Sequence, residues 1–254
     1  MEIEDLSIVK ENQRNNHWLL PKSIRGLIIG KSGCGKTTLL LNLLLKNGWL
    51  DYDTLYCFGK SLHQPEYQII KKGFDNNFTK KMIFKLIKYY RNNSVKDISN
   101  IITKLGETLK LKPNIKTKFF TDSSEIPDPS ELNSKNKNLL IFDDIMLEKQ
   151  NKIEDYYTRG RHNNVDCFYV AQNYFKLPRQ TIRENTNLII LFKQDGKNLN
   201  NIHQDHCTDI SLKEFTEFCN KCWAIRHGFA IIDLNCDNDF GKYKRCFDEF
   251  YIHA

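Results

Sequence analysis

Residues 23–45 read SIRGLIIGKSGCGKTTLLLNLLL and carry the most informative pattern in the chain. Gly30, Gly35, Lys36 and Thr37 fill the pattern Gly-x-x-x-x-Gly-Lys-Ser/Thr, whose backbone cradles nucleotide phosphates. An apolar run typical of a strand leads into this loop, and a leucine-rich run typical of a helix leads out of it. A chance glycine-rich turn before a core helix is the alternative, and the correct flanks on both sides favour a phosphate loop.

The residue types in this loop suit the chemistry of phosphate binding. Glycines let the backbone turn sharply and bring its N–H groups close to phosphate oxygens. The helix that follows directs the positive end of its dipole at the same anions. We expect Lys36 to reach the β- and γ-phosphates and Thr37 to bind Mg²⁺. The predicted nucleotide-binding residues are Gly30, Lys31, Ser32, Gly33, Cys34, Gly35, Lys36, Thr37 and Thr38.

The composition predicts one large intracellular α/β domain. The chain has 254 residues, a net charge of +7 and eight cysteines. Its acidic, polar beginning resembles neither a secretory signal nor a transit peptide, and no apolar run has the length of a membrane span. Without a signal peptide, the cysteines are expected to be reduced thiols. The modest positive charge suits a polyanionic partner but supports nucleic-acid binding only weakly.

The sequence NLLIFDD, residues 138–144, is the second informative stretch. Its apolar run predicts a buried strand, and its two acids fall at the carboxyl end, where parallel sheets place their ligand crevice. Because burying an unpaired carboxylate is costly, Mg²⁺ is the natural partner of Asp143. Asp144 is the candidate that orients the attacking water. The alternative is a strand ending in a turn with two exposed acids.

Three further candidates surround the next predicted strand, residues 166–171. Gln172 follows this strand and could contact the γ-phosphate, although a polar strand cap explains it almost as well. Arg159 and Arg161 precede the strand and are candidates for an arginine delivered to a neighbouring subunit, which stabilises charge on the transferred phosphoryl group. Arg183 is the rival for this role, and ordinary surface ion pairs are the alternative for all three.

The remaining pattern alternates buried strands with helices. Strands are predicted at 26–29, 53–58, 116–121, 187–192, 228–234 and 243–252, and helices at 38–45, 66–72, 79–91, 95–110 and 211–223. The segment 122–138 is expected to be a mobile connection. We therefore expect one domain, residues 1–254, with a helical insertion at about 60–116 and a C-terminal extension at about 196–254.

Three features outside the predicted site have competing explanations. Trp18 is expected to plug the sheet edge, with stacking on the nucleotide base as the alternative. The helix at 79–91 is basic on one face and could follow a DNA backbone, but an amphipathic helix with a solvated face is favoured. Cys219 and Cys222 form a Cys-x-x-Cys pair near His203, yet their helical spacing favours core residues over a zinc site.

The order of these elements predicts a RecA-like phosphate-loop NTPase with an additional catalytic acid. The predicted sheet is mostly parallel and flanked by helices, and an extra strand separates the phosphate-loop strand from the acidic strand in sequence. We expect Asp143 to lie beside Lys36, on adjoining strands of this sheet.

Three segments together resemble the poxvirus-type DNA-packaging ATPases of large and medium DNA viruses and virus-like mobile elements, within the FtsK/HerA group. They are GLIIGKSGCGKTTLL, NLLIFDDI and YYTRGRHNNVDCFYVAQNYFKLPRQTIRENTNLIILFK. The resemblance covers residues 18–195, with looser similarity to the end. The specific part is GRH, the strand ending in Ala-Gln-Asn, and the Pro and Arg-x-Asn that follow.

This resemblance implies an ATPase that moves double-stranded DNA into a preformed capsid. It implies a ring of five or six subunits, ATP and Mg²⁺ as cofactors, and a capsid or portal protein as partner. By position, Lys36 and Thr37 bind phosphate and Mg²⁺, Asp143 holds the metal, Gln172 senses the γ-phosphate, and Arg161 or Arg159 acts in trans. In much of the group the second acid is Glu, so Asp144 acts through a second water or yields to Glu148. The expected location is the viral assembly site in host cytoplasm or nucleus, or the virion.

Other functions stay open at the level of sequence. A GTPase should carry Asn-Lys-x-Asp, whereas Asn220 and Lys221 are followed by Cys-Trp. A small-molecule kinase seldom needs an acid pair and a polar-tipped strand. A nucleotide-gated assembly scaffold, or another DNA-translocating or helicase-like ATPase, is the main alternative.

Overall fold

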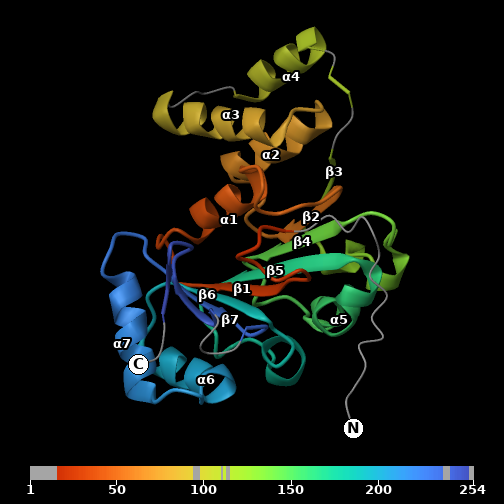
Figure 1. Cartoon of the computed structure of the whole chain (residues 1–254). Coiled ribbons are helices and arrows are strands. Elements are labelled where there is room, and N and C mark those ends of the chain that lie inside the picture. Colours follow the sequence, from red (N-terminus) through yellow and green to blue (C-terminus); the bar gives the residue numbers. More distant parts are fainter. Residues whose placement is uncertain (1–15, 94–97, 110, 113–114, 237–240, 252–254) are drawn as a thin grey trace.

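The computed structural model describes residues 16–93, 98–109, 111–112, 115–236 and 241–251. Its strands form one sheet in the order β3-β2-β4-β5-β1-β6-β7-β8-β9 (Figure 1). The first six strands in the chain are parallel, and the last three pair antiparallel at one edge. The strands are β1 (Arg25–Ile29), β2 (Thr54–Gly59), β3 (Lys116–Phe120), β4 (Asn138–Asp143), β5 (Val165–Ala171), β6 (Leu188–Leu191), β7 (Ala230–Asp233), β8 (Tyr243–Arg245) and β9 (Glu249–Phe250).

Helices cover both faces of this sheet (Figure 1). One face carries α1 (Lys36–Leu45), α2 (Pro65–Asp75), α3 (Lys80–Asn93) and α4 (Ile98–Leu109), and the other carries α5 (Asn151–Arg159), α6 (Gly196–His206) and α7 (Leu212–Trp223). Central strands are apolar throughout because both of their faces are buried. Within β1, Ile28 packs in the core on the α1 side, while Leu27 and Ile29 pack in the other core.

The predicted fold class is confirmed, and one detail of the predicted sheet is wrong. The sheet is mostly parallel with helices on both faces, and the helices α2, α3 and α4 lie between β2 and β3. However, the strands of Lys36 and Asp143 do not adjoin, because β5 pairs with β1 on one side and with β4 on the other. The acid therefore reaches the phosphate loop across the end of β5.

Most predicted helices are present, and two helices were not predicted. The described part of the helix predicted at 95–110 is α4, while residues 95–97 and 110 lie outside the described residues. Neither α5 nor α6 was expected. Both have many polar residues, and only narrow stripes of them, such as Leu199 and Ile202 in α6, are buried. No helix in the described ranges is both long and apolar enough to cross a membrane.

Three local predictions are wrong. Trp18 is 76% exposed rather than a plug, and Leu19 and Leu20 are buried in its place. The segment 122–138 is anchored rather than mobile: Ile126 and Leu132 are buried, and Asp128 caps a short turn. The tail predicted at 243–252 is not a single strand, because it turns between β8 and β9, where Cys246 has a positive φ of 51°. Residue 252 lies outside the described residues.

The helix α3 is amphipathic with a solvated basic face, as we predicted from the sequence. Ile83 and Ile87 are buried against the core, and Lys81, Lys85 and Lys88 are exposed on the opposite side. Cys219 and Cys222 are also buried core residues. Within the described ranges, no group of three or more His, Cys, Asp or Glu side chains could hold a metal ion.

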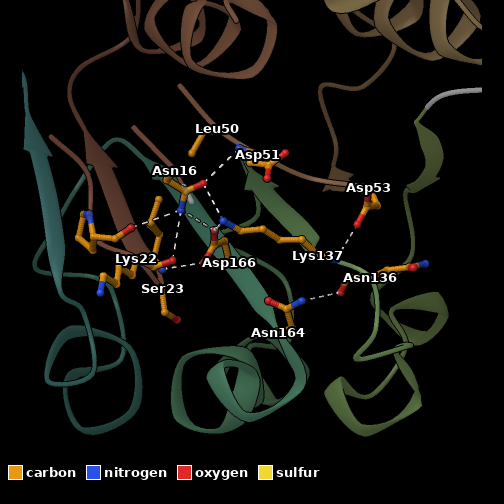
Figure 2. Close-up of polar contacts among 12 residues, drawn as sticks. Asn16, Lys22, Ser23, Leu50, Asp51, Asp53, Asn136, Lys137, Asn164 and Asp166 are labelled. Atoms are coloured by element: carbon orange, nitrogen blue, oxygen red, sulfur yellow. Dashed lines mark hydrogen bonds and ion pairs between the residues drawn. The ribbon is translucent and has the colours of Figure 1, made fainter. Parts of the chain in front are cut away.

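A buried polar network ties the described beginning of the chain to the amino ends of the central strands (Figure 2). Asp166 accepts hydrogen bonds from the Asn16 amide and from the Ile24 backbone N–H, both at 2.8 Å. The Lys137 ammonium lies 3.5 Å from the Asp166 carboxylate and donates to Asn16 at 3.0 Å. Asn16, Lys137 and Asp166 are all buried, so the charges stabilise the fold only as a complete set.

A second polar cluster joins α6 to the segment before β6. Arg183 is buried, and its guanidinium lies 3.2 Å from the Asp205 carboxylate. The Tyr174 hydroxyl donates to Asp205 and lies 2.8 Å from Nε2 of His206, which acts as the donor of that contact. Burial lowers the pKa of His206 to about 4, and this effect outweighs the opposing effect of Asp205.

This histidine predicts an acid-sensitive contribution to stability. Between pH 6.5 and 4, His206 becomes protonated in the unfolded chain but stays neutral in the folded chain, so stability falls as the pH decreases. The free energy of unfolding of the wild-type protein should fall between pH 7 and 4.5, in part because of His206. In His206→Gln this fall should be smaller by about 2 kcal/mol. Urea denaturation at several pH values measures this, with exposed His63→Gln as the control. Equal pH dependence in both variants would contradict the assignment.

Candidate functional site

A large cavity opens at the carboxyl ends of β1, β4 and β5. Its volume is about 970 Å³. Parallel strands place their ligand crevices at this edge, where strand connections diverge. Predicted site residues that line this cavity are Lys31, Ser32, Gly33, Gly35, Lys36, Thr37, Thr38, Asp143, Asp144 and Gln172. The structure therefore brings the phosphate loop, both acids and the polar strand tip to one site.

The phosphate loop has the backbone that anion binding requires. Gly33 and Gly35 have φ values of 76° and 115°, which side chains other than glycine seldom adopt. The helix α1 begins directly afterwards at Lys36, so its first N–H groups face the cavity end of the loop. The Lys36 ammonium donates to the carbonyl oxygens of Gly30 at 2.5 Å and of Lys31 at 2.9 Å. Lys36 thus lies folded over the loop, within reach of an anion held there.

Two predicted loop residues support the cavity without lining it. A Cβ on Gly30 would lie 2.5 Å from Cys34 Sγ and 2.7 Å from Phe192 Cβ. Glycine is therefore required at this position by packing as well as by the approach of phosphate. Cys34 is partly buried beside it. The nucleotide-contacting role of these two residues stays a prediction.

Asp143 is a buried carboxylate held by a side chain that the sequence did not reveal. It is 9% exposed, and the Tyr67 hydroxyl of α2 donates a 2.6 Å hydrogen bond to it. Burial raises the pKa of Asp143, the Asp144 charge acts in the same direction, and the Tyr67 hydrogen bond and the Lys36 charge oppose them. A cation bound in the cavity would stabilise the charged carboxylate.

The second acid has an unusual backbone and a fixed side chain. Asp144 has a φ of 56°, a conformation that costs free energy for most residues other than glycine. The Ser61 hydroxyl donates a 3.0 Å hydrogen bond to its carboxylate. The alternative acid, Glu148, lines the same cavity but pairs with the Lys60 ammonium at 3.2 Å. Asp144 has no such cation paired with it in the described part of the chain, and its role as the acid that orients water stays a prediction.

The arginine candidates lie away from this cavity. Arg159 ends α5, and Arg161 follows it in the turn before β5, at the amino edge of the sheet. The seven residues of β5 separate that edge from the cavity by about 20 Å. Arg159 pairs with Asp155 at 2.7 Å and Asp128 at 3.6 Å. Neither arginine reaches the cavity of its own chain, while Arg183 is buried in the ion pair with Asp205.

Several cavity residues could not be identified from the sequence. They come from the loops after β2, β5 and β6 and from the segment before β7, and include Lys60, Ser61, Gln64, Lys176, Gln194, Asp195 and His227. Each is a polar residue in a loop, and no motif distinguishes it. A signal that could have been used was position two residues after the end of a predicted strand, as for Lys60 and Gln194.

The donor set suits Mg²⁺ bound together with phosphates. Mg²⁺ is usually held by one or two carboxylates, several waters and substrate phosphate oxygens. The Asp143 carboxylate and the Thr37 hydroxyl line the same cavity and supply two oxygen donors. These residues therefore fit the predicted metal when nucleotide is present, and their role as its ligands stays a prediction.

Comparisons with known proteins match both the phosphate loop and the fold. The model of the ABC transporter family matches residues 14–124, a range that contains the phosphate loop and ends before the acidic strand. No curated protein matches the chain in sequence.

Solved structures of viral packaging NTPases are similar over nearly the whole chain. One is the genome packaging NTPase B204 from Sulfolobus turreted icosahedral virus 2 in complex with AMP, with TM-score 0.52, 12% identity and coverage of 91% of this chain and 98% of that one. Its complex with AMPPCP has TM-score 0.51, 13% identity and the same coverage. B204, the DNA-packaging ATPase from Sulfolobus Turreted Icosahedral Virus, has TM-score 0.50 and 15% identity, covering 90% and 97% of the two chains.

At these identities the likeness concerns the fold. In this chain the mostly parallel sheet carries the phosphate loop after β1 and two acids at the end of β4, as expected of a phosphate-loop NTPase. The chain therefore has a RecA-like phosphate-loop NTPase fold, the fold of these viral packaging NTPases.

Proposed function

We propose that this protein is an ATP-hydrolysing motor that packages double-stranded viral DNA into a preformed capsid. The observation that carries this proposal is that Lys36, Thr37, Asp143, Asp144 and Gln172 all line one cavity. Similar structures support it, since B204 is described as a genome packaging NTPase and as a DNA-packaging ATPase. The sequence resemblance to the FtsK/HerA group points to the same function.

In this proposal each residue of the cavity has a role in phosphoryl transfer. Lys36 and the backbone N–H groups of the loop would hold the β- and γ-phosphates. Thr37 and Asp143 would hold Mg²⁺, and such an ion would supply positive charge beside the phosphates. Asp144, fixed by Ser61, orients the water that attacks the γ-phosphate. Gln172, at the end of β5, contacts the γ-phosphate or that water. Tyr67 positions Asp143 through its hydrogen bond.

An arginine from a neighbouring subunit completes this site. Arg161 is exposed, and within the described ranges no carboxylate pairs with it, whereas Arg159 is held by two carboxylates. We therefore favour Arg161 as the arginine that acts in trans. ATP then closes the interface between subunits, because its γ-phosphate binds the arginine of the neighbouring subunit. Hydrolysis removes the γ-phosphate and so reopens the interface. The assembly is a ring of five or six subunits.

Mixing two inactive variants tests the shared site. Arg161→Ala lacks the donated arginine but has an intact cavity, and Lys36→Ala has a disabled cavity but an intact arginine. We expect each variant alone to lose about 100-fold or more of the ATPase rate, and mixed assemblies to regain a measurable part of it. If mixing restores no activity while mixed rings form, Arg161 does not act in trans. Arg159→Ala, mixed in the same way, tests the rival.

The polyanion on which the motor acts is duplex DNA, and the assembly works with a capsid or portal protein at the viral assembly site in host cytoplasm or nucleus. Measuring ATP hydrolysis with and without duplex DNA tests the function. We expect duplex DNA to increase the rate by about tenfold in the wild-type protein. A slow rate that DNA does not change, combined with nucleotide-dependent binding to a partner, would instead favour an assembly scaffold.

A further inference from the structure

A second, smaller cavity adjoins the nucleotide site at the beginning of α1. Its volume is about 210 Å³, and we call it the base cavity. Gly35, Thr38 and His227 line both this cavity and the larger one. A ligand with its phosphates in the loop could therefore extend into the base cavity without leaving the protein surface. The residues that line it are Gly35, Thr38, Leu39, Asn42, Phe192, His227 and Phe229.

The walls of the base cavity suit a flat, uncharged ring. Phe192 is buried, and its ring centroid lies 5.4 Å from that of Phe229, which is partly buried. Leu39 adds an aliphatic wall from α1. None of the residues lining this cavity is Lys or Arg, in contrast to the larger cavity with Lys31, Lys36, Lys60 and Lys176. The two cavities thus divide into a cationic part for phosphates and an apolar, aromatic part.

His227 marks the boundary between these two parts. It precedes β7, and its Nδ1 lies 3.0 Å from the carbonyl oxygen of Cys34 in the phosphate loop. Nδ1 donates this bond, because a carbonyl only accepts, and Nε2 is then an acceptor in the neutral ring. The same ring lies 3.3 Å from the position of a Cβ on Gly35. The imidazole is thereby attached to the loop although 193 residues separate it from Cys34 in the chain.

Asn42 is the polar group that distinguishes one base from another. Its amide nitrogen donates to the Thr38 carbonyl at 2.7 Å, which leaves the amide oxygen as an acceptor. Adenine presents an amino group where guanine presents a carbonyl oxygen, so an acceptor at this position favours adenine. One such bond, well placed, gives useful discrimination when the rejected base leaves polar groups unpaired.

We propose that the base cavity holds the adenine base of the nucleotide, stacked against His227 and Phe229 with Asn42 accepting from its amino group. This inference rests on the proposed function, because it assumes that the phosphate loop holds the phosphates. It assigns a role in nucleotide selection to Phe229 and His227, which belong to the C-terminal part of the chain.

Comparing ATP with inorganic tripolyphosphate separates the base from the phosphates. Both ligands are titrated with Mg²⁺ by calorimetry against wild-type protein, His227→Gly and Arg226→Ala. Glycine at 227 tolerates the φ of 61° found there, so the substitution adds no backbone strain. We expect His227→Gly to bind ATP about tenfold more weakly and tripolyphosphate unchanged, since base stacking on an aromatic ring gives about this gain. Arg226→Ala, an exposed neighbour that does not line the cavity, should bind both ligands normally.

The outcomes distinguish this inference from the proposed function. If His227→Gly weakens ATP and tripolyphosphate equally, or weakens neither, the base does not lie against His227. If wild-type protein binds ATP no more tightly than tripolyphosphate, the base cavity is not a base site, although the phosphate loop is. If wild-type protein binds neither ligand, the proposed function itself fails. Asn42→Leu provides a second test: it should remove a preference for ATP over GTP, and an unchanged preference would exclude Asn42 from base selection.

Discussion

Replacing Lys36 with alanine is expected to lower the ATP hydrolysis rate by about 100-fold to 1,000-fold, the usual effect of removing one preorganised donor from a site of developing charge. The reason is local: the Lys36 ammonium lies over the loop, bonded to the Gly30 and Lys31 carbonyls, where the β- and γ-phosphates would replace these partners. Alanine removes the charge but leaves the backbone N–H groups. Steady-state hydrolysis at saturating Mg²⁺ and ATP measures the effect.

The matched control for this variant is Lys46→Ala. Lys46 is an exposed lysine directly after α1, at the end farthest from the loop. Its removal changes the net charge by the same amount but should leave hydrolysis within about twofold, because exposed charges interact weakly over such separations. A Lys36→Ala protein that melts normally and keeps more than a tenth of the wild-type rate would contradict the assignment of the site.

The largest expected effect on stability comes from the buried network at the amino ends of the central strands (Figure 2). These ends lie opposite the nucleotide site. Asp166→Ala leaves the Lys137 ammonium buried without its carboxylate and removes the acceptor of the Asn16 and Ile24 donors. Breaking a buried ion pair in this way costs about 3–5 kcal/mol. Urea denaturation should therefore give a free energy of unfolding lower by about that amount.

Two comparison variants show whether burial is the cause. Asp155→Ala breaks an ion pair with Arg159 that is partly exposed, and it should cost about 1 kcal/mol or less. Replacing both charges of the buried pair, in Lys137→Met with Asp166→Leu, should recover much of the stability lost by Asp166→Ala, because no charge is then left unpaired. If Asp166→Ala costs no more than Asp155→Ala, the buried network does not stabilise the fold as described.

The parts of the site that could be predicted from the sequence are those that lie within one continuous segment. The phosphate loop requires glycines, a lysine and a hydroxyl at fixed spacing, and the acids of β4 follow a run of four apolar residues. In both cases local sequence fixes the backbone and the chemistry. The fold class followed from these two segments together with the order of the predicted strands and helices around them.

The rest of the site depends on contacts between distant segments. Tyr67 reaches Asp143 across 76 residues, and His227 reaches Cys34 across 193 residues. Nothing in the spacing around Tyr67 distinguishes it from an ordinary core aromatic. Trp18 illustrates the opposite error, an aromatic residue predicted to be buried that is exposed. Its neighbours Leu19 and Leu20 are buried instead. Whether an aromatic side chain is buried depends on the neighbours that the tertiary fold supplies.

We expected the strand of Asp143 to adjoin the phosphate-loop strand, but one strand lies between them. Sequence order gave no reason for β5 to lie between β1 and β4, yet this places Gln172 between the loop and the acids, because β5 ends directly before it. Gln172 therefore follows the central one of the three strands whose carboxyl ends border the cavity. This position supports a role for Gln172 beside the γ-phosphate, which Gln172→Ala can test in the same hydrolysis assay.

Displacement of a triplex-forming oligonucleotide from duplex DNA tests the motor function most directly, because a protein that moves along the duplex removes the third strand. We expect the wild-type protein to displace the oligonucleotide only when ATP and Mg²⁺ are present, and Lys36→Ala to displace none. A wild-type protein that hydrolyses ATP and binds the duplex but never displaces the third strand would contradict the proposed function.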